Sequence, residues 1–401
     1  MTARPPLPVV VTLLAGRTAF RSAVVLSAPL LLAVWGPDEF GPYALAVGTT
    51  LVLNPLVGSG TEKSAGTLLP RAGSAAAAGR LLSAHLLIAA AITASSLLLT
   101  IPFSVLDRQR TGLWLLAGAT NVGFGAVQAL VAYWRVLGVP SVDAASFGAL
   151  TAVTATGVAL AAFTGTGPRG YLTLQAVTSG AVCAGLAFGL RRRLGRPRRR
   201  TVALVGRTTV LLGANTLLAT APFSVVIAVL GGQSNPAAVS GLYVAVTAYT
   251  IVGNALDYLQ RVYQPWLTGT LLADPERVLD PVRRGGWLAV TVLAPAGALA
   301  VLGTSSLVGM TAVAPMLLAT ASVTWVLENH ATATLAATTR AAAVGLAVTA
   351  STAILLVPPL AASGALLALL AGTTIRCGLL IANLSGTGAN DYRDPQPSDA
   401  R

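Results

Sequence analysis

The chain has 401 residues, of which 54% are hydrophobic and only 10% are charged. A water-soluble protein carries roughly 25% charged residues, so this composition excludes an ordinary soluble domain. The formal net charge is +13, but no soluble stretch is large enough to carry the basic face that a nucleic-acid-binding domain needs. We therefore expect a membrane protein without a nucleic-acid partner.

Apolar runs of membrane-spanning length follow one another along the sequence. A transmembrane helix needs about 20 apolar residues, and about twelve runs meet this requirement. They occupy residues 9–35, 41–61, 82–104, 112–137, 142–164, 171–190, 202–231, 237–258, 286–307, 309–327, 341–357 and 360–384. The sequence thus predicts an all-α polytopic membrane protein with about twelve transmembrane helices.

Basic residues between these runs are unevenly distributed. Loops on one side of the predicted membrane carry most of the arginines, and residues 191–200 alone contain seven. The first loop on the opposite side carries Asp38 and Glu39 instead. Because cytoplasmic loops retain an excess of lysine and arginine, we predict a multi-pass protein of the plasma membrane with both termini in the cytoplasm.

The two halves of the sequence resemble each other weakly. Gly16–Thr18 (Gly-Arg-Thr) recurs as Gly206–Thr208, and Asn54 recurs as Asn254. A repeat that begins on the same side of the membrane predicts two parallel six-helix bundles around a central cavity. The predicted parts are a first bundle at 1–190, a basic cytoplasmic linker at 191–201, a second bundle at 202–385 and a disordered polar tail at 386–401.

Three arginines within or near apolar runs are candidate substrate-binding residues. Arg17 and Arg21 are four residues apart and share a helix face, and Arg207 is the repeat counterpart of Arg17. A charge at the bilayer centre costs at least about 2.5–3.5 kcal/mol, so it should face a wet cavity or a partner. Guanidinium groups bind phosphate by paired hydrogen bonds. The alternative is that Arg17 and Arg207 extend to the interface as topology anchors.

Other polar residues have both a structural and a functional interpretation. Asn54 and Asn254 could hydrogen-bond across helices or contact sugar hydroxyls of a substrate. Asp257 could pair with Arg261 one helical turn later, or serve as a proton- or cation-coupling acid. Near the end of the fourth run, a local Arg135 ion pair with Asp143 is the favoured interpretation.

Catalytic and metal-binding motifs are not recognisable in the sequence. There is no P-loop, HExxH motif or nucleophile elbow. Cys183 and Cys377 lie inside apolar runs, and His85 and His330 are far apart. We therefore predict a protein that is not an enzyme and that has neither a cofactor nor a metal site.

The segment Trp35–Ala44 (Trp-Gly-Pro-Asp-Glu-Phe-Gly-Pro-Tyr-Ala) resembles a recurring first-loop signature of polysaccharide and O-antigen flippases. These belong to the multidrug/oligosaccharidyl-lipid/polysaccharide (MOP) superfamily. The resemblance extends to Pro55–Gly60, whereas Gly231–Pro236 departs from the family's loop pattern in the second half. It implies two bundles around a cationic cavity, with Arg17 and Arg21 in the first bundle and Arg207 in the second.

The resemblance further implies a flippase-like transporter of a polyprenyl-(pyro)phosphate-linked saccharide. Two bundles would rock to move this lipid-linked saccharide across the plasma membrane by alternating access. Its expected partners are membrane lipids and the glycosyltransferases or polymerase of a glycan pathway. The alternatives are a multidrug or small-molecule exporter of the same superfamily, a major-facilitator-type carrier, and a non-transporting membrane scaffold in a glycan assembly complex.

Overall fold

The computed structural model describes residues 7–69, 72, 74–102, 111–139, 141–233, 235–302, 304–330 and 334–386. Nearly all of these residues are helical, and these ranges contain no strand. The prediction of an all-α protein is therefore confirmed. The predicted disordered tail lies outside the described residues except for Gly386.

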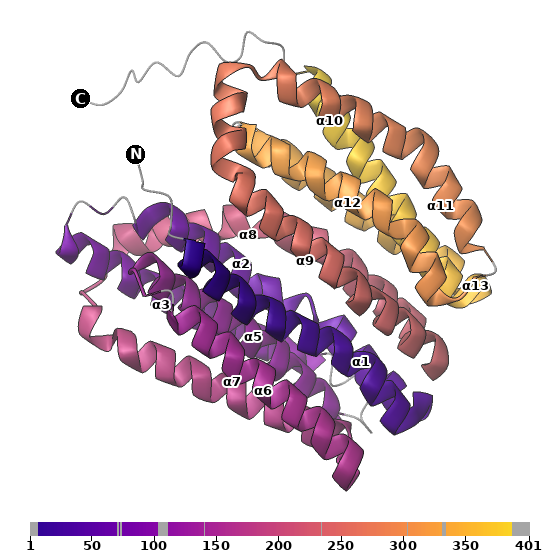
Figure 1. Ribbon diagram of the computed structural model, residues 1–401, viewed down its shortest axis with the longest axis horizontal. Coiled ribbons are helices and arrows are strands. Elements are labelled where there is room, and N and C mark those ends of the chain that lie inside the picture. The colour runs from indigo at the N-terminus through magenta and orange to yellow at the C-terminus, as the bar shows by residue number, and fades with distance from the viewer. Residues whose placement is uncertain are drawn as a thin grey trace. The chain divides into compact units, whose positions relative to one another are not determined.

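The chain divides into two compact units, Met1–Ile251 and Val252–Arg401, which are described separately. Unit 1 is drawn from indigo to pink in Figure 1. Its elements are α1 (Leu7–Thr50), α2 (Leu53–Leu68), α3 (Ala75–Leu98), α5 (Thr111–Val136), α6 (Ser141–Thr164), α7 (Pro168–Leu190), the 3-10 turn η3 (Arg191–Arg193), α8 (Arg199–Gly231) and the beginning of α9 (Pro236–Ala273).

Helix packing in unit 1 places α1 against α6, and α2 between α5 and α8. Helix α3 also contacts α5 and α8. The predicted linker 191–201 consequently lies inside unit 1, because α8, which follows it, packs against helices that precede it. The predicted bundles 1–190 and 202–385 and their central cavity stay predictions.

The interior of unit 1 combines aromatic and aliphatic side chains from several helices. Phe20 packs edge-on against Phe124 with ring centroids 5.2 Å apart, and the centroid of the Phe147 ring lies 5.7 Å from that of Phe20. Tyr133 and Leu150 are fully buried in the same cluster. This cluster fixes α1, α5 and α6 together and thereby positions the polar side chains near their ends.

Helix α1 changes direction at Gly36, where φ is 69° and ψ is 170°. Pro37 follows, and a residue that precedes proline is disfavoured in the helical region. The positive φ is accessible to glycine because it has no Cβ atom. The Gly36–Pro37 step therefore divides α1 into two spans.

We expect Gly36→Ala to lower the free energy of unfolding by about 1–3 kcal/mol, because this backbone region is nearly restricted to glycine. Nothing lies within 4 Å of a Cβ atom placed at Gly36, so a crowding effect does not add to the cost. The control is Gly148→Ala in α6, where the space is also open but the backbone is helical. In thermal unfolding in detergent, the control should have a higher midpoint than the unmodified chain. An equal increase of the midpoint in Gly36→Ala would contradict the prediction.

Unit 2 contains the rest of α9 together with α10 (Glu276–Leu288), the π-helical turn η4 (Ala289–Leu293), α11 (Ala294–Val301), α12 (Ser306–His330) and α13 (Thr334–Gly386). Helix α12 packs along α13, and α11 contacts both. Helix α13 kinks at Ala361, where φ is 48°, after Pro358 and Pro359. The two prolines remove helical hydrogen-bond donors and so favour a break at this place.

Nine helices among the described residues are long and apolar enough to cross a membrane. The first and last, Gly16–Gly66 and Ala336–Leu384, have 51 and 49 residues, and each divides at its kink into two spans. Helix α9, with 38 residues, contains the apolar run predicted at 237–258.

Candidate functional site

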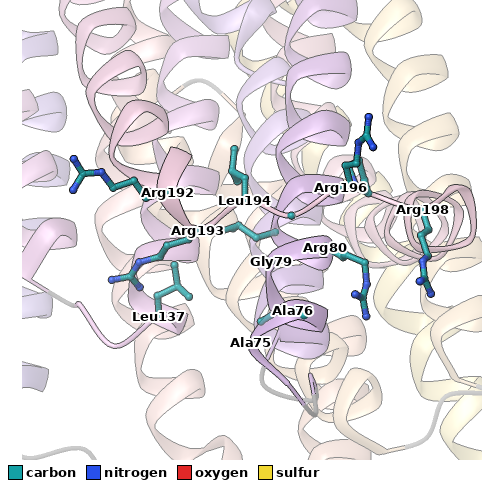
Figure 2. A pocket seen from close by; sticks show the side chains of 14 residues that line it. Ala75, Ala76, Gly79, Arg80, Leu137, Arg192, Arg193, Leu194, Arg196 and Arg198 are labelled. Atoms are coloured by element: carbon teal, nitrogen blue, oxygen red, sulfur yellow. The ribbon is translucent and has the colours of Figure 1, made fainter.

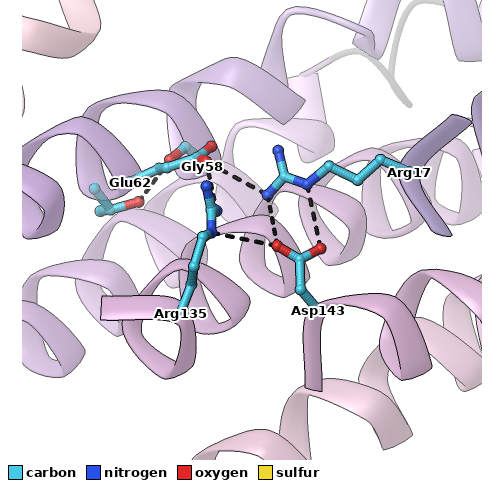
Figure 3. A network of polar contacts seen from close by, with 6 residues as sticks. Arg17, Gly58, Glu62, Arg135 and Asp143 are labelled. Atoms are coloured by element: carbon cyan, nitrogen blue, oxygen red, sulfur yellow. Dashed lines mark hydrogen bonds and ion pairs between the residues drawn. The ribbon is translucent and has the colours of Figure 1, made fainter. Parts of the chain in front are cut away.

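Four charged side chains from four helices of unit 1 form one ionic network (Figure 3). Arg17 of α1 contacts both carboxylate oxygens of Asp143 in α6, with Nε 3.2 Å from Oδ1 and a terminal nitrogen 3.3 Å from Oδ2. The same terminal nitrogen lies 3.4 Å from Oε1 of Glu62 in α2. Arg135 of α5 donates to the same Glu62 oxygen at 2.8 Å, and its Nε lies 3.3 Å from Asp143 Oδ2.

The network is electrically balanced, because two guanidinium groups face two carboxylates. The Asp143 side chain is 1% exposed and that of Glu62 is 14% exposed, so neither carboxylate is well hydrated. A buried carboxylate is tolerated only when it is paired and hydrogen-bonded. The Arg17 guanidinium also lies 5.1 Å from the centroid of the Phe147 ring, a cation–π contact.

Local sequence accounts for the pairing of Arg135 with Asp143 in this network. Arg135 is in the last turn of α5 and Asp143 is in the first turn of α6, where the helix dipoles favour a cation and an anion respectively. The short connection between the helices brings the two side chains together. The predicted Arg135–Asp143 ion pair is therefore confirmed.

Close packing of α1 against α6 accounts for the position of Arg17 in the network. A Cβ atom at Gly16 would lie 2.9 Å from the Ala144 Cα atom, so α1 approaches α6 at a glycine. This approach places Arg17 beside Asp143. From the sequence, Arg17 is predicted to be a phosphate ligand or an interfacial anchor, and its pairing with Glu62 and Asp143 was not predicted.

The other predicted arginines are arranged differently. Arg21 lies one helical turn beyond Arg17 on α1 and is half-buried. Arg207 lies on α8 with an exposed side chain, which is the environment that the topology-anchor interpretation expects. The structure thus places Arg17 and Arg21 on one helix of unit 1, and the substrate-binding role of all three arginines stays a prediction.

Of the two predicted asparagines and the predicted coupling acid, only Asn54 has a described side chain. Asn54 is half-buried on α2, where its carbonyl oxygen would lie 2.5 Å from a Cβ atom at Gly125. Asn254 and Asp257 belong to α9, but their side chains, like that of Arg261, lie outside the described residues. Their roles stay predictions.

Asn121 is a polar residue that the sequence analysis missed. It is 4% exposed in α5 and donates to the Val47 carbonyl at 3.1 Å and to Thr50 Oγ1 at 2.9 Å. These bonds join α5 to the second part of α1. An asparagine in the middle of an apolar run was the available signal.

A second missed residue is Arg376, which lies within the apolar second part of α13 in unit 2. Its guanidinium donates to Thr324 Oγ1 of α12 at 3.2 Å. Glycines at 345 and 372 allow the two parts of α13 to meet beside it, because a Cβ atom at Gly345 would lie 2.9 Å from Arg376 Cβ. A single arginine inside an apolar run was the signal in the sequence.

His85 is fully buried in α3 and has two hydrogen-bond partners. Its Nδ1 lies 2.8 Å from the Leu81 carbonyl oxygen, which can only accept, so Nδ1 carries the proton. Its Nε2 lies 3.1 Å from Ser64 Oγ and accepts from that hydroxyl. This geometry satisfies a neutral histidine and joins α3 to α2. Groups of three or more histidine, cysteine or acidic residues able to hold a metal do not occur in the described part of the chain.

The Trp35–Ala44 signature forms an aromatic cluster in unit 1. The Trp35 indole donates to the Thr166 carbonyl at 2.9 Å and lies 5.4 Å from the Tyr43 ring. Tyr43 in turn lies 5.9 Å from Tyr171 of α7 and 6.1 Å from Tyr243 of α9. The signature residues therefore hold α1, α7 and α9 together beside the Gly36 kink.

No protein-family model and no curated protein sequence matches the chain. Among solved structures, it is similar to an inward-facing multidrug resistance MATE family transporter of the MOP superfamily, with a TM-score of 0.59 and 12% identity over 94% of this chain and 96% of the other. It is also similar to the eukaryotic MATE transporter AtDTX14, with a TM-score of 0.54 and 14% identity over 96% and 97% of the two chains. The chain therefore has the twelve-helix, two-bundle fold of MATE transporters of the MOP superfamily.

Proposed function

We propose that this chain is a membrane transporter that moves an anionic amphiphile across the bilayer by alternating access, without covalent chemistry. The fold that it shares with MATE transporters supports a transport function. The resemblance of Trp35–Ala44 to the flippase signature supports a polyprenyl-(pyro)phosphate-linked saccharide as the substrate. The fold gives no support to the major-facilitator alternative.

The charge balance beside Arg17 is the observation that carries this proposal. Glu62 and Asp143 each contact two guanidinium groups, so their charge is neutralised within the network. These acids are poorly placed to attract a cationic drug. Arg21 lies one turn further along the same helix as a candidate guanidinium for the phosphate group of a substrate.

The test is translocation of a fluorescent lipid-linked oligosaccharide in proteoliposomes. We expect Arg21→Ala to reduce the translocation rate roughly 10- to 100-fold, the effect of losing a hydrogen bond to a charged group of about 1.5–3 kcal/mol. The matched control is Arg284→Ala in α10, whose side chain is 81% exposed, and it should retain the rate. If Arg21→Ala translocates at the full rate at normal expression, Arg21 does not bind the phosphate.

A multidrug or small-molecule exporter is the second candidate, because solved structures with this fold include transporters described as multidrug resistance proteins. In that case Asp257 would be the coupling acid. Proton-driven efflux of a soluble cation that is lost in Asp257→Asn, together with no movement of the lipid-linked saccharide, would establish the exporter. The absence of both activities would favour a scaffold.

The membrane context of the proposal follows from the spans and the loop charges. The nine apolar helices of membrane-spanning length in the described part of the chain support a multi-pass membrane protein. We propose the plasma membrane as its location and the cytoplasm as the side of both termini, because lysine and arginine are retained on that side. Glycosyltransferases or a polymerase of a glycan pathway are the proposed protein partners.

A further inference from the structure

A basic pocket lies at one end of unit 1, where the chain passes from α7 to α8 (Figure 2). Its volume is about 830 Å³, and residues of the first turns of α3 line it together with residues 192–198. Five arginines belong to the lining, and no acidic residue does. These arginines are Arg80, Arg192, Arg193, Arg196 and Arg198. We call this feature the arginine pocket.

The backbone of the arginine pocket is held in place by specific contacts. The Gly195 amide donates to the Gly79 carbonyl at 3.1 Å and to Ser83 Oγ at 3.0 Å. A Cβ atom at Gly79 would lie 3.0 Å from the Arg193 carbonyl oxygen, so the two segments meet at small residues. The basic segment is therefore docked on α3, and its arginines project from a fixed backbone.

Part of the lining of the arginine pocket is apolar. Ala75, Ala76 and Ala78 of α3 contribute small side chains, and Leu137 and Leu194 add larger ones. Figure 2 shows the guanidinium groups extending in several directions, with those of Arg80 and Arg198 extending the same way. A surface that combines apolar contact with surrounding guanidinium groups matches a phosphate-bearing lipid headgroup and the start of its acyl chains.

The position of the arginine pocket also suits a lipid. It lies where α7 ends at Leu190, α8 begins at Arg199 and α3 begins at Ala75, so three helix ends surround it. The positive-inside distribution assigns this end to the cytoplasmic leaflet, whose anionic lipids attract basic segments.

We propose that the arginine pocket binds the headgroup of an anionic phospholipid of the cytoplasmic leaflet. This site is separate from the Arg17 network and does not depend on which substrate the chain transports. Phosphatidylglycerol is the probe, and binding is measured by titrating a fluorescent analogue into the purified full chain in uncharged detergent. A phosphatidylcholine analogue, which carries no net charge, reports binding without an anionic headgroup.

The basic segment supplies a matched pair of triple variants with the same net charge. The pocket triple is Arg193→Gln, Arg196→Gln and Arg198→Gln. The control triple is Arg191→Gln, Arg199→Gln and Arg200→Gln, at exposed positions of the same segment that do not line the pocket. General attraction between a basic segment and anionic lipid is reduced equally in both triples. A difference in lipid affinity between the two triples therefore measures the contribution of the arginine pocket.

We expect the pocket triple to bind phosphatidylglycerol about tenfold more weakly than the control triple, since each basic residue near a lipid surface contributes measurably to binding. Equal weakening in the two triples would overturn the proposal and leave only general attraction. Equal affinity of the unmodified chain for phosphatidylcholine would also overturn it. Displacement of the lipid by the same concentration of inorganic phosphate would identify a free-phosphate site instead. The measurement needs no transport, so failure of the proposed transport function leaves its result unaffected.

Discussion

Asp143→Asn is expected to destabilise unit 1 by about 3–5 kcal/mol, the usual effect of removing one partner from a buried ion pair. Asparagine retains the shape of the side chain but not its charge. Arg17 and Arg135 would then share the Glu62 carboxylate, and their side chains are only 21% and 32% exposed. Thermal unfolding in detergent, followed by tryptophan fluorescence, should show a large decrease in the midpoint.

Two further variants separate the network from other effects of this substitution. Asp38→Asn removes an equal charge from an exposed position and should leave the midpoint nearly unchanged. Arg17→Gln combined with Asp143→Asn restores charge balance and leaves the 2.8 Å contact between Arg135 and Glu62 in place, so most of the stability should return. If Asp143→Asn is no more destabilising than Asp38→Asn, the network does not stabilise the fold.

The same double variant distinguishes two roles of Arg17. If the folded double variant transports the lipid-linked saccharide normally, the charge of Arg17 serves the structure alone. If its midpoint recovers but translocation is lost, Arg17 also acts on the substrate, as the sequence resemblance implies. A buried ion pair that also binds substrate would have to exchange partners during transport, because a guanidinium held by two carboxylates has few donors left for phosphate.

The part of the site that the sequence predicted is its local part. Arg135 and Asp143 are separated by one short connection, so helix ends and dipoles were enough to pair them. Arg17 and Asp143 are 126 positions apart, and Arg17 and Glu62 are 45 apart. These pairs depend on how α1 packs against α6 and α2, which hydrophobic periodicity does not specify. The spans were predictable because apolar length is a property of each segment alone.

The packing of α8 is a contact that the sequence pattern does not specify. The basic segment at 191–200 marks the midpoint of the sequence, yet α8 packs on α2 and α3 within unit 1. This contact depends on particular glycines, and the chain has 41 of them. Nothing in the sequence distinguishes a glycine at a helix crossing from one that faces lipid.

Gly60→Ala is expected to separate α2 from α8 and to destabilise the fold by about 1–3 kcal/mol, the usual effect of overpacking. A Cβ atom at Gly60 would lie 2.5 Å from the Thr209 carbonyl oxygen and 3.1 Å from the Gly213 Cα atom. Both are backbone atoms of α8, so rotation of a side chain cannot relieve the contact. Small residues at helix crossings in membranes allow this kind of close backbone approach.

Gly66→Ala in the same helix provides the control, because nothing lies within 4 Å of its Cβ position. Alanine is the better helix former, so this variant should be more stable than the unmodified chain by about 0.5–1 kcal/mol. The two substitutions are chemically identical and lie in α2, so opposite shifts of the thermal midpoint would locate the effect at the contact with α8. Equal shifts would show that the close contact between α2 and α8 at Gly60 does not determine the thermal midpoint. Opposite shifts would support α8 as a component of the first unit and not only the beginning of the second half of the sequence.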